Sequence, residues 1–98
     1  MRFRFKRKKL EKLYFEGKGI KAYPKNVVDN FYIVMTIIEA AVDERDLRAL
    51  KGLRFEKLKL RKPEQYSIRL NEQFRLVFAF ERDESGKILV IIDIEDYH

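Results

Sequence analysis

The amino-acid sequence predicts a two-layer α+β domain. The predicted order is a strand, two helices and an antiparallel meander of three to four strands, which sets the helices beside a largely antiparallel sheet of four or five strands. Apolar residues recur with the 3.6-residue period of a helix before Gly52 and with the two-residue period of a strand after it. The chain has 98 residues, enough for one core, so residues 1–98 are predicted to form a single domain.

The first quarter of the chain is predicted to hold a short strand and a short helix. Residues 2–6 alternate polar and apolar side chains, with the phenylalanines on one face, as a strand does. The next apolar residues follow a helical spacing and are Leu10, Leu13 and Tyr14. Gly17 and Gly19 end this helix, because glycine readily adopts the left-handed conformation that closes a last turn. Residues 18–24 are expected to form a loop.

Residues 25–42 are predicted to form the longest helix. Their apolar side chains recur at helical spacing over about five turns. These side chains are Val27, Val28, Phe31, Val34, Met35, Ile38 and Val42. The polar segment of residues 43–52 contains the apolar pair Leu47 and Leu50, and it is expected to be a connection or a short turn of helix.

The second half of the chain is predicted to be a meander of strands. The segments with strand character are residues 53–59, 65–71, 74–82 and 87–95. Asp83–Gly86 supplies a hairpin turn whose glycine can take a positive φ, whereas residues 60–64 make a looser loop around Pro63. The side chains expected to face the helices are Phe74, Leu76, Phe78 and Phe80.

Composition excludes several classes of protein. The chain has no cysteine and one histidine, which rules out disulfides, thiolate catalysis and cysteine-held zinc or iron–sulfur sites, and it predicts no metal or other cofactor. No apolar stretch approaches the roughly 18 residues of a membrane span. The basic N-terminal segment lacks the apolar core of a signal peptide, so we expect a soluble, cytoplasmic protein.

The net charge of +6 is unevenly distributed. Residues 1–26 carry ten basic and two acidic side chains, and residues 51–75 carry eight and three. Basic segments of this kind are typical of proteins that contact phosphates or an acidic partner. A charge-rich, amide-poor composition also arises for reasons of thermal stability, so charge alone leaves both interpretations open.

Strand register brings two arginines together. If the apolar faces of neighbouring strands are to coincide, residues 71–73 form the turn, and Arg69 then lies directly opposite Arg75 on the other face. Like charges in this position destabilise an antiparallel pair, whereas a surface that binds phosphate has a use for them. The alternative is that the two guanidinium groups splay apart or share a carboxylate such as Glu56. Arg75 has apolar neighbours along its strand, which places it in mid-sheet and favours a functional role.

Further charged residues complete a set that can cleave an RNA phosphodiester without metal. The attacking 2′-hydroxyl needs a base, the leaving 5′-oxygen needs an acid and the phosphorane needs fixed positive charge. Glu56, the single histidine His98 and Arg75 can supply these roles. Tyr97 can stack on an unpaired base or donate through its hydroxyl. Glu56 and Lys59 have opposite strand parity, so both reach one face only if the strand ends between them.

Three segments give the chain a resemblance to a known family. They are Glu56–Lys59, Gln65–Phe78 and Glu95–His98. In this order and spacing they resemble the HigB-type (plasmid maintenance killer) toxins of the RelE/ParE superfamily, over essentially the whole chain. The resemblance implies a RelE-like fold. It also implies a toxin of a type II toxin–antitoxin system, an mRNA interferase that enters the ribosomal A site and cleaves translated mRNA.

The resemblance implies roles for individual residues. Arg75 matches the family arginine that stabilises the phosphate transition state. The C-terminal catalytic cluster of the family is matched by Asp96, Tyr97 and His98, with His98 as the acid. Glu56 falls where many HigB-like toxins carry histidine, but the related YoeB-like toxins use a glutamate in a similar context as the base, so the resemblance implies that Glu56 is the base.

RNA contacts and partners are implied as well. The basic residues expected to contact RNA are Lys59, Arg61, Lys62 and Arg69. Lys59 matches the basic residue of the family's Leu-Lys-Gly-Asp segment, although the loop that follows lacks both of the family's glycines. The expected partners are a helix-turn-helix antitoxin of the HigA type, the 70S ribosome and mRNA, with no membrane.

Two other functions share this fold. A toxin of the ParE type poisons DNA gyrase and lacks a nuclease cluster, and Glu56, Arg75 and His98 favour the nuclease over it. A decayed family member would be inactive as a nuclease and would be kept only in a regulatory complex with its antitoxin. Only an assay separates that last function from the nuclease.

Overall fold

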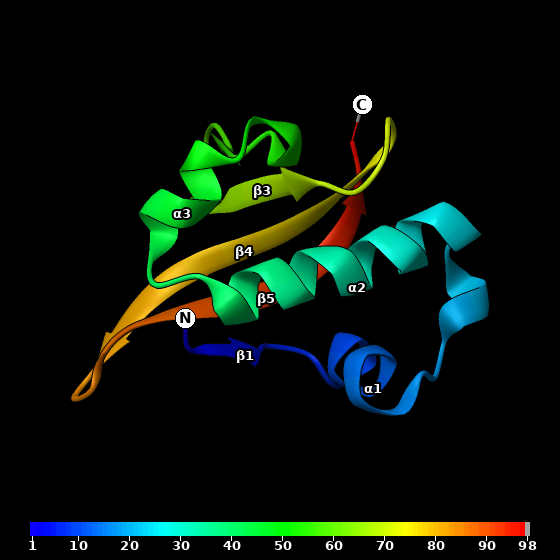
Figure 1. Ribbon diagram of the computed structural model, residues 1–98, viewed down its shortest axis with the longest axis horizontal. Coiled ribbons are helices and arrows are strands. Elements are labelled where there is room, and N and C mark those ends of the chain that lie inside the picture. Colours follow the sequence, from blue (N-terminus) through cyan, green and yellow to red (C-terminus); the bar gives the residue numbers. More distant parts are fainter. Residues whose placement is uncertain (98) are drawn as a thin grey trace.

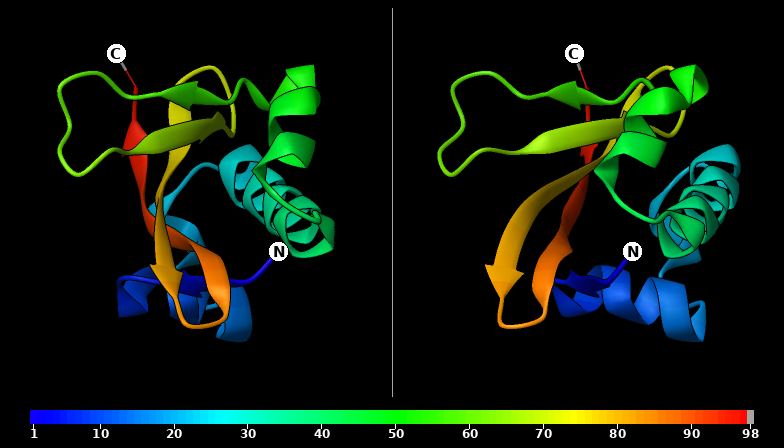
Figure 2. Two further views of the ribbon diagram at one scale, coloured as in Figure 1. Left: turned by 90° about the vertical axis from the view of Figure 1, so that its left-hand side faces the viewer. Right: turned by 60° about the vertical axis from the view of Figure 1, so that its left-hand side comes forward.

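The structure is a computed structural model that describes residues 1–97, and His98 lies outside the described residues. One sheet carries its helices on a single face (Figures 1 and 2). The strands are β1 (Phe3–Phe5), β2 (Glu56–Lys57), β3 (Tyr66–Arg69), β4 (Phe74–Asp83) and β5 (Gly86–Asp96). The helices are α1 (Lys8–Glu16), α2 (Lys25–Ala40) and α3 (Glu44–Ala49), with the 3-10 turns η1 (Ile20–Ala22) and η2 (Lys51–Leu53).

The five strands lie in the order β1-β5-β4-β3-β2 (Figure 1). β1 is parallel to β5 and the other neighbours are antiparallel, which confirms the predicted meander over β2 to β5. The register of β4 against β5 shifts between Val77 and Phe78. None of the helices within residues 1–97 combines the length and apolar character needed to cross a membrane.

The main core lies between the helices and one face of the sheet. α2 contributes buried side chains at the predicted helical spacing, which are Val27, Val28, Phe31, Val34, Met35 and Ile38. From β4, Leu76 and Phe78 are fully buried, and Phe74 and Phe80 pack at the margin of this core. The predicted helix-facing residues of β4 are therefore confirmed. A second, smaller apolar cluster on the other face consists of Val77, Ala79 and Ile92, with Leu58 packed against it.

The end of α2 and the start of α3 differ slightly from the sequence prediction. α2 ends at Ala40, because Ala41 is extended and the Val42 N–H donates to the Asp46 carboxylate instead of continuing the helix. α3 begins directly after Asp43, whose side chain accepts a hydrogen bond from a backbone N–H in the first turn. Of the two predicted possibilities for residues 43–52, the short helix is the one that forms.

β2 is shorter than the strand predicted over residues 53–59, and that prediction is wrong in its bounds. Leu53 closes η2, and Arg54 has a left-handed backbone conformation, with φ of 52°, that turns the chain before pairing begins. After Lys57 the chain leaves the sheet in a turn that includes Leu60, whose φ is 63°. Residues other than glycine adopt such angles rarely, and an apolar pattern does not reveal them.

An ion pair at the hairpin end of the sheet makes stability depend on pH. Arg2 donates two hydrogen bonds to the Asp83 carboxylate, at 2.7 and 2.8 Å. This contact is the main reason that the pKa of Asp83 falls from 3.8 to about 2, and the Ser85 N–H assists it. A carboxyl with a lowered folded-state pKa stabilises the fold above its unfolded pKa, and the contribution is lost as pH falls through the folded pKa.

We therefore expect the Asp83→Asn variant to have a lower Tm than the parent near neutral pH. The difference should shrink between about pH 4 and about pH 2, where the parent loses the contribution of the ionised carboxylate. Thermal unfolding followed by circular dichroism across this range measures both proteins. A difference that stays constant down to about pH 2 would contradict the assignment.

Candidate functional site

Arg75 lies near the start of β4, on the face of the sheet that carries no helices. It is paired with Arg69 across β3 and β4, so the predicted register is confirmed. The Arg75 side chain is only 10% exposed. A charge buried to this extent requires hydrogen-bond acceptors close to it.

Two acceptors fix the Arg75 guanidinium group. Its Nε donates a hydrogen bond to Ser67 Oγ at 2.8 Å, and its Nη2 donates to the Arg54 carbonyl oxygen at 2.6 Å. Ser67 is fully buried on β3, and Arg54 is the left-handed residue that precedes β2. Neither acceptor carries a charge, so the guanidinium is oriented without being neutralised by them.

Glu56 and Tyr97 lie beside the same guanidinium. Glu56 Oε1 is 3.6 Å from Arg75 Nη2, and the Glu56 side chain is 43% exposed. The Tyr97 ring centroid is 4.9 Å from Arg75 Cζ, within the range of a cation–π contact. The Tyr97 N–H donates to the Gln73 carbonyl at 2.6 Å, which holds Tyr97 against the start of β4. The structure thus brings together three of the residues predicted for catalysis.

Arg69 turns away from Arg75. Its Nη2 lies 2.7 Å from Glu72 Oε1, and its Nε donates to the Asn71 carbonyl at 3.3 Å. The two guanidinium groups are therefore splayed, each near a different carboxylate, and only Arg75 approaches Glu56. This arrangement relieves the like-charge repulsion that their register would otherwise impose.

A surface hollow of about 490 Å³ lies next to this cluster. The residues that line it are Glu56, Lys57, Leu58, Lys59, Arg61 and Tyr97. Glu56 and Lys59 both line it because β2 ends at Lys57, which removes the parity conflict seen in the sequence. Within residues 1–97, no three His, Cys, Asp or Glu side chains are grouped as a metal site requires.

Arg61 is held by acidic and amide oxygens. Its Nη1 and Nη2 donate to the two carboxylate oxygens of Glu95 at 3.0 and 2.8 Å, and Nη1 also donates to Gln65 Oε1 at 2.9 Å. The hydrogen bond to Glu95 is the largest cause of a raised Arg61 pKa. Lys62 is exposed in the same loop and does not line the hollow beside Tyr97.

Asp96 and His98 are the remaining residues of the predicted catalytic set. Asp96 is the last residue of β5 and is paired with Phe74, so its position alternates with those of Glu95 and Tyr97. Its carboxylate accepts a hydrogen bond from Gln73 Nε2 at 2.9 Å. His98 lies outside the described residues, and its predicted role as the acid stays a prediction.

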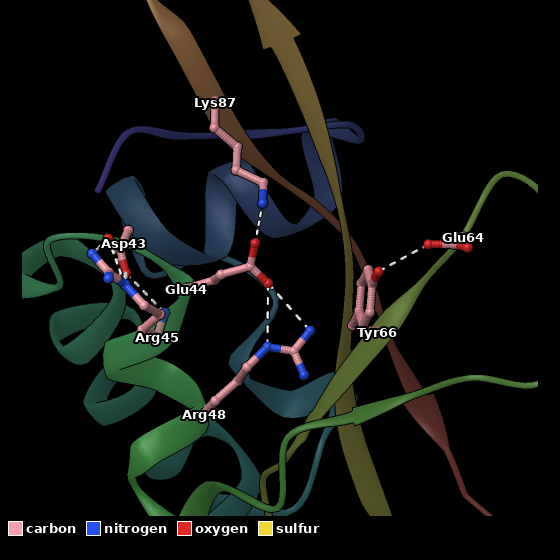
Figure 3. A network of polar contacts seen from close by, with 7 residues as sticks. All are labelled: Asp43, Glu44, Arg45, Arg48, Glu64, Tyr66 and Lys87. Carbon is pink, nitrogen blue, oxygen red and sulfur yellow. Dashed lines mark hydrogen bonds and ion pairs between the residues drawn. The ribbon is translucent and has the colours of Figure 1, made fainter.

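A polar network on the helix side of the sheet fixes the segment that leads into the site (Figure 3). Glu44 of α3 accepts hydrogen bonds from Lys87 of β5 and from Arg48, the latter at 3.2 Å. These two cations lower the pKa of Glu44, with Lys87 the larger cause. The Arg48 guanidinium in turn lies 4.3 Å from the Phe55 ring centroid. Because Phe55 stands between Arg54 and Glu56 in the chain, α3 helps to position both.

Sequence reasoning missed the residues that support the cluster. Ser67 and the Arg54 carbonyl orient Arg75, and Glu95 binds Arg61. The register of β3 and β4 could have indicated Ser67, because Ser67 lies two residues before Arg69 and therefore on the same face of the sheet as Arg69 and Arg75. Glu95 lies directly opposite Arg75 and could have been found in the same way. Nothing in the sequence indicates that the Arg54 carbonyl accepts a hydrogen bond from Arg75.

Solved structures of small toxins share this fold. The YoeB/ParE toxin from Agrobacterium tumefaciens has a TM-score of 0.59 and 14% identity, with all of both chains covered. The YoeB-YefM complex from Staphylococcus aureus contains a chain with a TM-score of 0.57 and 24% identity, covering all of this chain and 97% of that one. The predicted two-layer α+β fold of the RelE type is therefore confirmed.

Sequence comparison places the chain in one family. Toxin HigB-1 of Vibrio cholerae is 37% identical over 80 residues, which cover 82% of this chain and 84% of that protein. Residues 3–98 match the family described as the RelE-like toxin of type II toxin-antitoxin system HigB. The chain belongs to this family of HigB-like toxins, as the sequence motifs predicted.

Proposed function

We propose that this toxin is an endoribonuclease that cleaves mRNA by attack of a 2′-hydroxyl on the adjacent phosphodiester. The observation that carries the proposal is the Arg75 guanidinium, which neutral acceptors orient and beside which Glu56 lies at 3.6 Å. A fixed cation next to a carboxylate suits a reaction that develops negative charge on the phosphorane oxygens while a proton leaves a hydroxyl. Membership of the HigB-like toxin family supports the same function.

Each residue of the cluster has a role in this reaction. Glu56 takes the proton from the 2′-hydroxyl, whose oxygen then bonds to phosphorus. Arg75 stabilises the charge on the phosphorane oxygens, and the bond to the 5′-oxygen breaks as that oxygen is protonated. We assign this last proton to His98, which follows Asp96 by two residues in the chain. The products are a 2′,3′-cyclic phosphate and a 5′-hydroxyl end.

Tyr97 and the basic residues around the hollow bind the RNA in this proposal. The exposed half of the Tyr97 ring can stack on an unpaired base, while Arg75 holds the ring from another side. Lys59 lines the hollow, and Lys62 lies exposed on the same loop, so both can contact phosphates. Arg69 is one-third exposed and paired with Glu72, away from the hollow, so a contact of Arg69 with RNA would lie outside the hollow.

The partners follow from the family and the proposed substrate. We propose the 70S ribosomal A site with its bound mRNA as the target, which places the activity in the cytoplasm. We also propose a helix-turn-helix antitoxin of the HigA type as the partner that holds the toxin inactive. The assignment of the family to type II toxin–antitoxin systems supports an antitoxin partner.

Incubation with translating ribosomes and end-labelled mRNA tests the proposal. We expect cuts in the A-site codon that leave a 2′,3′-cyclic phosphate, and no cuts in the same mRNA without ribosomes. Gyrase-dependent DNA breaks in place of RNA cuts would show a toxin of the ParE type. Absence of both, from a folded protein that binds an antitoxin, would show a decayed family member.

Deletion of His98 tests the proposed acid. We expect the shortened chain to cleave at least about tenfold more slowly, since a positioned general acid contributes about 10²–10⁴-fold and water replaces it only in part. Growth arrest on expression should be relieved in the same variant. A chain that is equally toxic without His98 would remove this residue from the mechanism while leaving Glu56 and Arg75 in place.

A further inference from the structure

Arg61 and Glu95 join the loop of residues 58–65 to β5 in a way that the proposed reaction does not use. Both carboxylate oxygens of Glu95 accept hydrogen bonds from Arg61, at 3.0 and 2.8 Å. The two side chains are 37% and 35% exposed. Two-point pairs between arginine and a carboxylate are geometrically specific and stronger than single contacts. This pair stands beside the hollow, which Arg61 also lines.

Glu95 occupies a position from which it could disable Arg75. The two residues are directly opposite each other in the ladder between β4 and β5. Side chains in such pairs start about 4.5–5.5 Å apart at their Cβ atoms, which is within reach of an arginine–carboxylate contact. A free carboxylate here would attract the Arg75 guanidinium and repel the phosphate of an incoming RNA.

In the structure Glu95 and Arg75 have different partners. Arg75 donates to Ser67 and to the Arg54 carbonyl, whereas the Glu95 carboxylate is taken by Arg61. We infer that Arg61 is a positioning residue that sequesters Glu95 and so keeps Arg75 available for the scissile phosphate. This inference rests on the proposed nuclease function and assigns Arg61 a role other than direct contact with RNA.

The loop has other anchors besides this ion pair, which makes the inference testable. Leu58 packs against the apolar cluster on the uncovered face of the sheet. The Leu58 N–H also donates to the Gln65 carbonyl at 2.9 Å, which closes the base of the loop. Removal of the Arg61 guanidinium should therefore leave the Glu95 carboxylate without its ion-pair partner, while the packing of Leu58 and its hydrogen bond to Gln65 still hold the loop.

The decisive experiment compares four proteins in the ribosome-dependent cleavage assay: the parent, Arg61→Ala, Glu95→Gln and the double variant. We expect kcat/KM to fall about tenfold in Arg61→Ala, the equivalent of one unfavourable charge contact. Glu95→Gln should stay within about twofold of the parent. The double variant should recover most of the loss, because it has no carboxylate left to compete for Arg75. Equal losses in Arg61→Ala and the double variant would overturn the inference, since the pair would then act only by holding the loop.

A second measurement does not depend on cleavage. The NMR signal of the Arg75 Nε–H is followed during titration with inorganic phosphate, and affinity should be weaker in Arg61→Ala than in the parent and restored in the double variant. Asp83→Asn is the matched control, because it removes a two-point arginine pair at the other end of β4 and should change neither readout. If the parent does not cleave RNA, the proposed function is wrong, and this titration still decides the inference. Equal phosphate affinity in all variants would refute it.

Discussion

Replacement of Arg75 by lysine should lower kcat/KM for mRNA cleavage by about 10²–10³-fold, the usual cost of losing a preorganised stabiliser of transition-state charge. Arg75 uses Nε for Ser67 and Nη2 for the Arg54 carbonyl, and in the proposed reaction Nη1 of the same planar group meets the phosphate. An ammonium group has no such fork, so it cannot keep both acceptors and also meet the phosphate in a fixed direction. Single-turnover cleavage of mRNA on stalled ribosomes measures this loss.

The control for this variant is Arg82→Lys. Arg82 lies on the same strand and is exposed near the hairpin, far along β4 from the site. We expect its cleavage rate to equal that of the parent. Circular dichroism of Arg75→Lys checks that the sheet still forms, because Arg75 is nearly buried. A folded Arg75→Lys protein that cleaves within about threefold of the parent would contradict the role of Arg75.

Replacement of Glu56 by glutamine should lower kcat by about 10²–10⁴-fold and leave KM nearly unchanged. Glutamine has the same shape, so it can remain near Arg75 and line the hollow, but it does not accept a proton from the 2′-hydroxyl. The loss should therefore fall on the chemical step and not on RNA binding. Measurement of kcat and KM over a range of ribosome-bound mRNA concentrations separates the two.

Glu64→Gln is the matched control for Glu56. Glu64 is an exposed carboxylate in the loop beside β2 and pairs with Lys57 at 2.9 Å. Its amide variant should cleave like the parent. If Glu56→Gln instead raises KM and spares kcat, Glu56 contributes to binding and the base must be another group.

Much of the fold could be predicted because local periodicity determines it. The spacing of Val27, Phe31, Val34 and Ile38 indicates α2, and these side chains are buried as expected. Register could be predicted as well, since a tight turn at residues 71–73 allows only one pairing of Arg69. That single pairing is enough to place Arg75 on the face of the sheet opposite the helices.

Two of the contacts that support the site could not be predicted from local pattern. The contact of Arg61 with Glu95 joins residues far apart in the chain, and no periodicity links them. The carbonyl of Arg54 reaches Arg75 only because Arg54 adopts a left-handed φ, which no residue-type preference suggested. The left-handed backbone at Arg54 is also the reason that the predicted start of β2 is wrong.

The position of β5 in the sheet has a consequence for synthesis of the protein. β5 comes last among the strands along the chain, yet it lies between β4 and β1 and completes both pairings. Until β5 has been synthesised, β1 and the edge of β4 that faces β5 therefore have no partner strand, and the pairing that places Glu95 and Tyr97 beside Arg75 cannot exist. The arrangement of Glu56, Arg75 and Tyr97 is therefore completed only after β5 has been synthesised, at a late stage of making the chain.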